Sequence, residues 1–242
     1  MWLLALETTT REGSVALLRD DDVVAARPGD PALSHAERLP ADFAAVLAVA
    51  GLAPSAIDLF AVATGPGGFT GLRIGLAAVQ GLALSLDRPV AGVASLPALA
   101  WAAFDADPAL PHAGVWLDAS RGEVFAATYR RAPATSDAWP LEVMTPPTSA
   151  SPDDTLAAWA GMLPAGTSIV AACREPAQAA LAGAGYRPLI APTQLAGTVG
   201  RIAWRMHALG LSAAPHALMP EYVRRPDVEI DRDRRAAAAR AR

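Results

Sequence analysis

The sequence contains no lysine. All 20 basic side chains among its 242 residues are arginines, and 24 acidic side chains bring the formal charge to −4. A P-loop uses a lysine to reach the terminal phosphates of its nucleotide, so this absence excludes a P-loop NTPase. A negative net charge also argues against a basic nucleic-acid-binding surface that covers the whole molecule.

Cysteine and long apolar runs are scarce as well. The one cysteine, Cys173, cannot form an internal disulfide, which agrees with a reducing compartment. It follows an apolar run, so we expect a buried thiol in the core. No stretch approaches the roughly 18 consecutive apolar residues of a membrane span, and the first residues lack the basic start of a signal peptide. We therefore expect a cytoplasmic protein with no membrane association.

Apolar runs alternate with helical patterns along the chain, which is typical of an α/β protein. With 52% hydrophobic residues, the chain can bury a substantial core. Three strands over residues 2–28 are followed by a helix from Ser34 to Ala50, in which Ser34 and Glu37 form a capping-box pattern. The next expected elements are a strand over residues 57–65, a helix over 70–84, a strand over 88–93 and a helix from Ser95.

The second half repeats this order. The stretch "AGVWLDASRGEVFAATYR" can be laid over "WLLALETTTREGSVALLR", and in each a strand ends in a carboxylate, Asp118 or Glu7, before a polar turn. We expect two duplicated βββαβα subdomains, over residues 1–106 and 107–225, and a mobile Arg/Ala-rich tail over 226–242. Two such halves are the arrangement of actin-like ATPases and sugar kinases, in which nucleotide phosphates lie between the two hairpin turns.

Glycines are concentrated in "ATGPGGFTGLRIGLAAVQGLAL", residues 63–84. This stretch fails the dinucleotide-binding pattern G-x-G-x-x-G, because Thr70 stands at the last glycine position. In the helix that follows, Gly71, Gly75 and Ala78 recur at steps of three or four and form a face of small side chains. Glycine inside a helix costs roughly 0.5–1 kcal/mol relative to alanine. We therefore expect another helix to pack closely on this face, either the helix over 34–50 or a helix of another subunit.

Residues 65–75, "GPGGFTGLRIG", resemble the GPGSFTGLRIG signature of the TsaB (YeaZ) family at ten of eleven positions. The similarity extends to "LLALETTTREGSVAL", "SHAERLPADFAAVL", "LDASRGEVFAATY" and "PEYVRR", and covers most of residues 1–225 in order. Gly68 replaces the usual serine, and Glu7 replaces the common aspartate. The resemblance implies the actin-like (ASKHA, ribonuclease H-like) fold. It also implies a place in the bacterial machinery that makes N6-threonylcarbamoyladenosine at position 37 of tRNAs that read ANN codons.

In that family TsaB is regarded as the non-catalytic partner of TsaD, and a third protein, the ATPase TsaE, joins the complex. The resemblance therefore implies an accessory, activating subunit without catalytic residues, which forms a homodimer when isolated. It places the contact with TsaD on the two helices over 34–50 and 70–84. The implied partner-binding residues are His35, Leu39, Phe43, Leu47, Gly71, Arg73, Ile74, Gly75 and Ala78.

A second set of residues marks a candidate degenerate nucleotide cleft: Glu7, Thr8, Thr9, Asp118 and Arg121. Capping of the two turns is the alternative role for the carboxylates. The catalytic relatives hold a metal with an H-x-x-x-H helix motif, but no two of the four histidines here are four residues apart. We therefore expect no metal site and no tightly bound cofactor, with ATP or ADP an option in the assembled complex.

Two other functions stay open besides the activating subunit. A free-standing actin-like ATPase or kinase would turn over nucleotide without a partner. A peptidase is the weaker option, because the sequence shows no metal motif and no nucleophile motif. The arginines of the tail allow weak or indirect contact with tRNA, although a solvated terminus is the default explanation for this composition.

Overall fold

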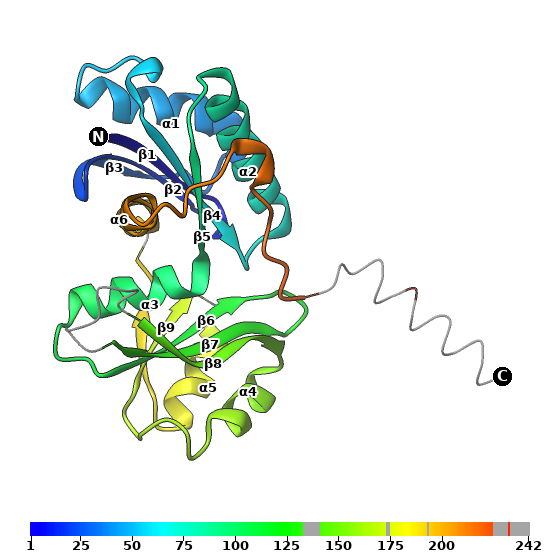
Figure 1. Ribbon diagram of the computed structural model, residues 1–242. Coiled ribbons are helices and arrows are strands. Elements are labelled where there is room, and N and C mark those ends of the chain that lie inside the picture. Colours follow the sequence, from blue (N-terminus) through cyan, green and yellow to red (C-terminus); the bar gives the residue numbers. More distant parts are fainter. Residues whose placement is uncertain (133–140, 173–174, 193, 225–231, 233–242) are drawn as a thin grey trace.

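Two five-stranded sheets and the helices that cover them form the fold (Figure 1). The computed structural model describes residues 1–132, 141–172, 175–192, 194–224 and 232. Cys173 and nearly all of the tail lie outside these residues. The expectations of a core thiol and of a mobile tail that contacts tRNA therefore stay predictions.

The first sheet has the strand order β3-β2-β1-β4-β5. Its first three strands pair as antiparallel hairpins, and the other two continue the sheet in parallel from β1. The strands are β1 (Trp2–Glu7), β2 (Ser14–Arg19), β3 (Asp22–Pro28), β4 (Leu59–Gly65) and β5 (Val90–Ala94). The central strands β1 and β4 are covered on both faces, which explains why their sequences are nearly all apolar.

The second sheet repeats this topology in the order β10-β9-β6-β7-β8. Its strands are β6 (His112–Asp118), β7 (Val124–Arg131), β8 (Leu141–Ala150), β9 (Ser168–Ala172) and β10 (Arg187–Ile190). The duplication expected from the sequence is therefore confirmed. The expected βββαβα unit is too short, because each half continues as βββαβαβα.

In the described part of the chain, five α-helices connect these strands and a sixth follows the last strand. They are α1 (His35–Val49), α2 (Phe69–Ser85), α3 (Ser95–Ala106), α4 (Pro152–Trp159), α5 (Glu175–Gly183) and α6 (Leu195–Ala208). The capping box at the start of α1 is confirmed: Ser34 Oγ accepts from the Glu37 amide, and the Glu37 carboxylate accepts from the Ser34 amide at 2.8 Å.

The helices make three layers around the two sheets (Figure 1). Helices α1 and α2 cover one face of the first sheet, and α4 and α5 cover the outer face of the second. Between the sheets lie α3 and α6, which pack against each other. The two central helices are exchanged: α6, from the second half of the sequence, covers the first sheet, while α3, from the first half, packs on the second.

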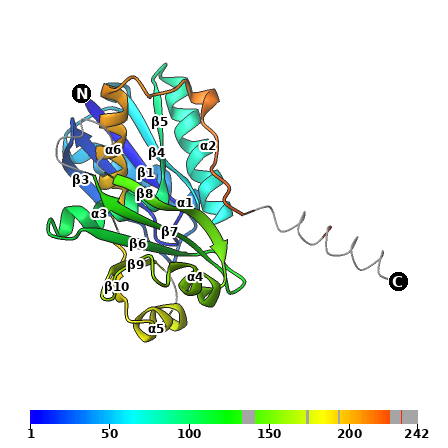
Figure 2. The ribbon, with the colours of Figure 1, turned by 60° about the horizontal axis from the view of Figure 1, so that its bottom comes forward.

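After α6 the chain returns along α2, as Figure 2 shows. The side chain of Gln80 on α2 donates to main-chain carbonyls of this segment at 3.0 Å. Further on, the Glu221 amide donates to the carbonyl of Thr64 at 2.7 Å. Arg224 Nη1 then donates to the carbonyl of Ala119 at 3.0 Å. The segment thus connects the first half to the turn between β6 and β7.

Candidate functional site

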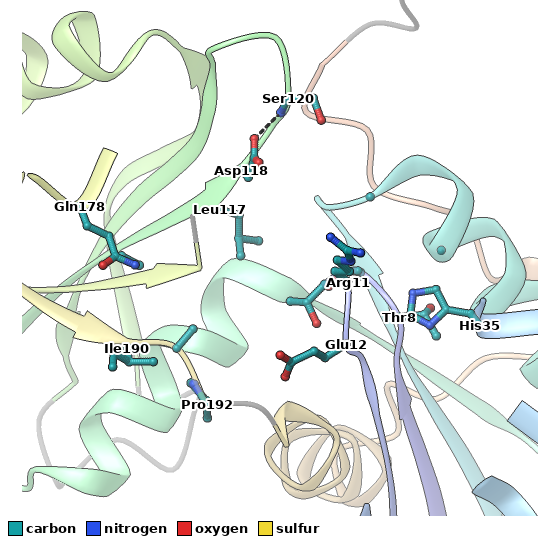
Figure 3. Close-up of a pocket in the computed structure, with 16 residues that line it drawn as sticks. Thr8, Arg11, Glu12, His35, Leu117, Asp118, Ser120, Gln178, Ile190 and Pro192 are labelled. Carbon is teal, nitrogen blue, oxygen red and sulfur yellow. Dashed lines mark hydrogen bonds between the residues drawn. The ribbon is translucent and has the colours of Figure 1, made fainter. Parts of the chain in front are cut away.

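A cavity of about 620 Å³ lies between the two halves, where β1 and β6 end. Figure 3 shows Arg11, Glu12 and His35 on its first-half side, and Asp118 and Gln178 on its second-half side. The wall also includes the N-terminal part of α2 and the residues after β10. The two hairpin turns therefore face each other across one space, which is the arrangement that the duplicated strand pattern predicts.

The structure brings together three of the five residues that the sequence assigns to a nucleotide cleft. Thr8, Thr9 and Asp118 line the cavity. Glu7 lies beneath the turn at 1% exposure and does not line the cavity. Arg121 stands in the β6–β7 turn with a left-handed backbone, φ 55°, and is also not part of the wall.

Both carboxylate oxygens of Glu7 are used inside its own turn. Oε1 accepts from the amides of Thr9 and Thr10 and from the Thr9 hydroxyl, the last at 2.6 Å. Oε2 accepts from the Thr10 hydroxyl at 2.8 Å. A phosphate at this turn would need the same amide and hydroxyl donors. Glu7 thus acts as the cap of the first turn and leaves few donors for a nucleotide.

The glycines of residues 65–75 let α2 approach this first turn. The Gly68 amide donates to the carbonyl of Thr9 at 2.8 Å. A Cβ at Gly71 would lie 2.2 Å from the carbonyl oxygen of Thr8, and a Cβ at Gly75 would lie 2.1 Å from the Thr8 hydroxyl. At Gly71 the expected close approach of the helix over 34–50 is confirmed in part, because a Cβ there would also lie within 3.0 Å of the His35 ring on α1. At Gly75 the expectation is wrong, because this glycine accommodates Thr8, the residue that follows β1.

A buried arginine, missed in the sequence, supports the same turn from α1. Arg38 is 3% exposed, and its Nη1 donates to Asp42 Oδ2 at 2.6 Å. Its Nη2 donates to the carbonyl of Glu12 and to His35 Nδ1, the latter at 2.7 Å. Because a guanidinium has no acceptor, Nδ1 of His35 must accept, and the ring proton is on Nε2. The sequence signal that could have revealed this arginine is the pair Arg38 and Asp42, two opposite charges four residues apart on the buried side of a helix.

Burial lowers the pKa of His35, and the positive charge of Arg38 lowers this pKa further. The negative charge of Glu7 and a hydrogen bond with the Thr10 main chain act in the opposite direction. His35 therefore belongs to the wall of the cavity and to the Arg38 hydrogen-bond network, and it is only partly exposed. This placement differs from that of a surface histidine on α1.

Across the described ranges, no group of three or more His, Cys, Asp or Glu side chains is placed to hold a metal ion. Within the same residues, no helix has the length and apolar character needed to cross a membrane.

Outside the cavity, α1 and α2 expose faces of unusually small side chains. On α1 the exposed positions include Ala41, Ala44 and Ala48, and on α2 they include Ala77 and Gly81. These positions recur at steps of three or four, so they form one stripe on each helix. A Cβ at Gly81 would meet no atom within 4 Å in the described structure. In contrast to Gly71 and Gly75, no close packing within the described chain explains why a glycine stands at position 81.

The nine residues expected to contact a partner have different exposures. The structure buries Leu39, Leu47, Gly71 and Gly75 in the first half of the protein. Four others are partly exposed, namely His35, Phe43, Ile74 and Ala78, and Arg73 is exposed. Direct contact with a partner stays a prediction for all nine, and it is physically simplest for the residues with exposed side chains.

Arg73 also links α2 to the C-terminal segment. Its guanidinium lies 3.9 Å from the centre of the Phe69 ring, and Phe69 stacks on Tyr222 at 5.7 Å. Arg73 Nε donates to the Tyr222 hydroxyl at 3.2 Å. Phe69 and Arg73 come from the glycine-rich signature and Tyr222 from "PEYVRR", so the two motifs meet in space.

Two duplicated halves with hairpin turns that face a shared cavity define a protein of the actin-like (ASKHA) fold class. Solved structures agree: YeaZ from Pseudomonas aeruginosa has a TM-score of 0.75 and 27% sequence identity, and the match covers 91% of this chain and 99% of that chain. A family model described as TsaD, tRNA N6-adenosine threonylcarbamoyltransferase, matches residues 26–157.

Sequence relatives lead to the same family. The tRNA threonylcarbamoyladenosine biosynthesis protein TsaB of Escherichia coli (strain K12) is 37% identical over 131 residues, 54% of this chain and 56% of that protein. The match therefore spans little more than half the length of that relative. An uncharacterized protein of Mycobacterium tuberculosis (strain H37Rv) is 30% identical over 231 residues, 94% of this chain and 93% of that protein. The chain belongs to the TsaB (YeaZ) family, which confirms the resemblance found in the sequence.

Proposed function

We propose that this protein is a non-catalytic, activating subunit in the synthesis of tRNA N6-threonylcarbamoyladenosine, and that it acts by binding a TsaD-type protein. Membership of the TsaB family supports the pathway, since its relative in Escherichia coli is named for that biosynthesis. In this proposal TsaE is the third component of the complex with the TsaD-type protein. The isolated chain forms a homodimer, and its contact with tRNA is weak or indirect. The cytoplasm is the corresponding compartment.

The observation that carries this proposal is the exposed face of α2 around Gly81. A glycine in the middle of a helix costs roughly 0.5–1 kcal/mol relative to alanine, and nothing described in the chain packs there to explain it. A helix of a partner would explain it, because small side chains let two helix backbones approach closely. Large apolar side chains are also exposed near the ends of the two helices, Leu84 on α2 at 69% and Val49 on α1 at 66%.

The cavity between the halves is not the centre of this proposal. The donors of the first turn are paired with Glu7, which supports the absence of a tightly bound nucleotide in the isolated subunit. ATP or ADP in the assembled complex stays part of the proposal. An independent ATPase or kinase would need phosphate donors, and Glu7 already occupies the amides of Thr9 and Thr10 in the first turn.

Threonylcarbamoyl transfer to an ANN-decoding tRNA tests the proposal, with purified TsaD, TsaE and a source of threonylcarbamoyl-adenylate. We expect product to depend on this chain, and the chain to co-elute with TsaD. Gly81→Arg fills the exposed face and should abolish both effects while the variant remains folded. Gly183→Arg is the matched control, because Gly183 at the end of α5 also has open space around it. Equal activity without the chain, or full activity of Gly81→Arg, would contradict the proposal.

A further inference from the structure

A second cavity, of about 320 Å³, adjoins the large one and shares Gly68, Asp118 and Ser120 with its wall. Three distant segments form its wall: the glycine-rich loop with the start of α2, the β6–β7 turn, and residues 221–224. The wall is largely apolar and includes the side chains of Phe69, Leu72 and Phe125. Its volume lies near the lower end of the roughly 300–1,000 Å³ typical of sites for small ligands.

Glu221 lines this cavity, and its carboxyl group has no compensating partner among the described residues. Within the described residues, no side-chain or main-chain group donates a hydrogen bond to it, and burial raises its pKa. Arg224, the nearby cation in the wall, is directed toward the β6–β7 turn: its Nη1 donates to the carbonyl of Ala119, and its Nε lies 3.6 Å from Glu123.

A tyrosine hydroxyl beneath the same region is also unsatisfied. Tyr129 is 1% exposed, and its Oη has no hydrogen-bond partner in the part of the chain that the structure describes. Burial raises the pKa of Tyr129, and the negative charge of Glu221 raises this pKa further. A half-buried carboxylate without a donor is costly, and a ligand that brings a positive charge would remove much of that cost.

We propose that this cavity is a binding site for a small organic cation, in which Glu221 pairs with a protonated amine, amidine or guanidine and the apolar wall holds a flat or apolar body. The site differs from the cavity between the β1–β2 and β6–β7 turns, and it does not depend on pairing with a TsaD-type protein. The proposal therefore stands independently of the proposed function.

Benzamidine and benzamide make a matched pair of probes, because they have nearly the same shape and only benzamidine carries a charge. Titration of the full chain by calorimetry should show saturable binding of benzamidine and at least about tenfold weaker binding of benzamide. Amide resonances of residues 67–72, 118–125 and 221–224 should shift on addition of benzamidine. Equal affinity for the two probes, no saturable binding, or shifts confined to the large cavity would overturn the proposal.

Two variants test whether benzamidine binding depends on the negative charge of Glu221. Glu221→Gln keeps the shape of the side chain and should weaken benzamidine binding by about tenfold or more. Glu142→Gln is the control, because it removes the same charge from an exposed ion pair with Arg130 on the second sheet. Circular dichroism checks that both variants are folded. Unchanged affinity of Glu221→Gln for benzamidine would overturn the proposal. The comparison of benzamidine with benzamide uses the wild-type chain, so it tests the proposal even if a variant does not fold.

Discussion

At the scale of single residues, the first hairpin turn is held by charged side chains that point into the protein. The Glu7 carboxylate accepts hydrogen bonds from the main chain of the turn, and Arg38 on α1 donates to the carbonyl of Glu12 in the same turn. His35 completes this arrangement by accepting a hydrogen bond from Arg38. A protonated His35 could not accept that bond and would place a second positive charge beside the guanidinium. The neutral ring is therefore part of the folded state.

This arrangement predicts a pH dependence of stability. The pKa of His35 is lowered in the folded protein, whereas in the unfolded chain it is about 6.5. The stabilisation is therefore complete above that value and is lost as the pH falls toward the folded pKa, because only the unfolded chain gains the proton. Free energies of unfolding in urea between about pH 5 and pH 8 measure this loss.

His35→Gln is the matched variant, because its side-chain oxygen accepts from Arg38 but does not titrate. The difference between wild type and His35→Gln removes the contributions of the other histidines. We expect this difference to be constant above about pH 6.5 and to change below it. A difference that stays flat over the whole range would show that His35 titrates normally in the folded protein.

At the scale of elements, helix α2 uses its glycines in two different ways. Gly75 faces inward against the Thr8 hydroxyl, and Gly81 faces outward with open space around it. The same residue type thus marks tight internal packing at one position and an unoccupied surface two turns later. The two sites can be separated by the smallest substitution, because alanine adds one methyl group to each.

We expect Gly75→Ala and Gly81→Ala to change stability in opposite directions. Gly75→Ala must displace Thr8 and should lower the free energy of unfolding by about 1–3 kcal/mol. Gly81→Ala gains helix propensity without a clash and should raise it by roughly 0.5–1 kcal/mol. Urea denaturation of both variants measures these values. A loss of stability in Gly81→Ala would mean that the outer face is packed against something already present in the isolated chain.

Signals that are local in the sequence predicted the elements well. Ser34 with Glu37 marks a helix start that the structure confirms, since a cap depends on neighbours three residues away. Helix α5 is short and rich in alanine, and strand β10 has only four residues, one of them a proline, so neither shows a clear period in the sequence. The contact between Gly75 and Thr8 joins residues that are distant in sequence, and no local pattern contains it.

At the scale of the whole molecule, the exchange of α3 and α6 joins the two halves. The inner face of the first sheet is covered by α6, which forms only near the end of the described chain. The expected boundaries, 1–106 and 107–225, stay a prediction, but a fragment cut there would leave this apolar face uncovered. The repeated strand pattern in the sequence reveals the two halves. It does not reveal the exchange of α3 and α6, because the sequence does not show on which sheet each of these helices packs.

We therefore expect a fragment of residues 1–106 not to fold on its own, and the full chain to unfold in one transition. The physical reason is the exposed inner face of the first sheet, including Leu3, Leu18 and Leu59, which α6 otherwise buries. Circular dichroism of the fragment and calorimetry of the full chain test both points. A fragment with a cooperative melting transition, or two separate transitions in the full chain, would contradict this expectation.

The exchanged helix also has a consequence for biosynthesis. A ribosome makes the first sheet early, but the helix that closes its inner face ends at residue 208. During translation that apolar face has no cover from its own chain until most of the polypeptide has emerged. A nascent chain of this length is therefore a natural substrate for a chaperone such as those that bind at the exit tunnel, and the final folding step follows the synthesis of α6.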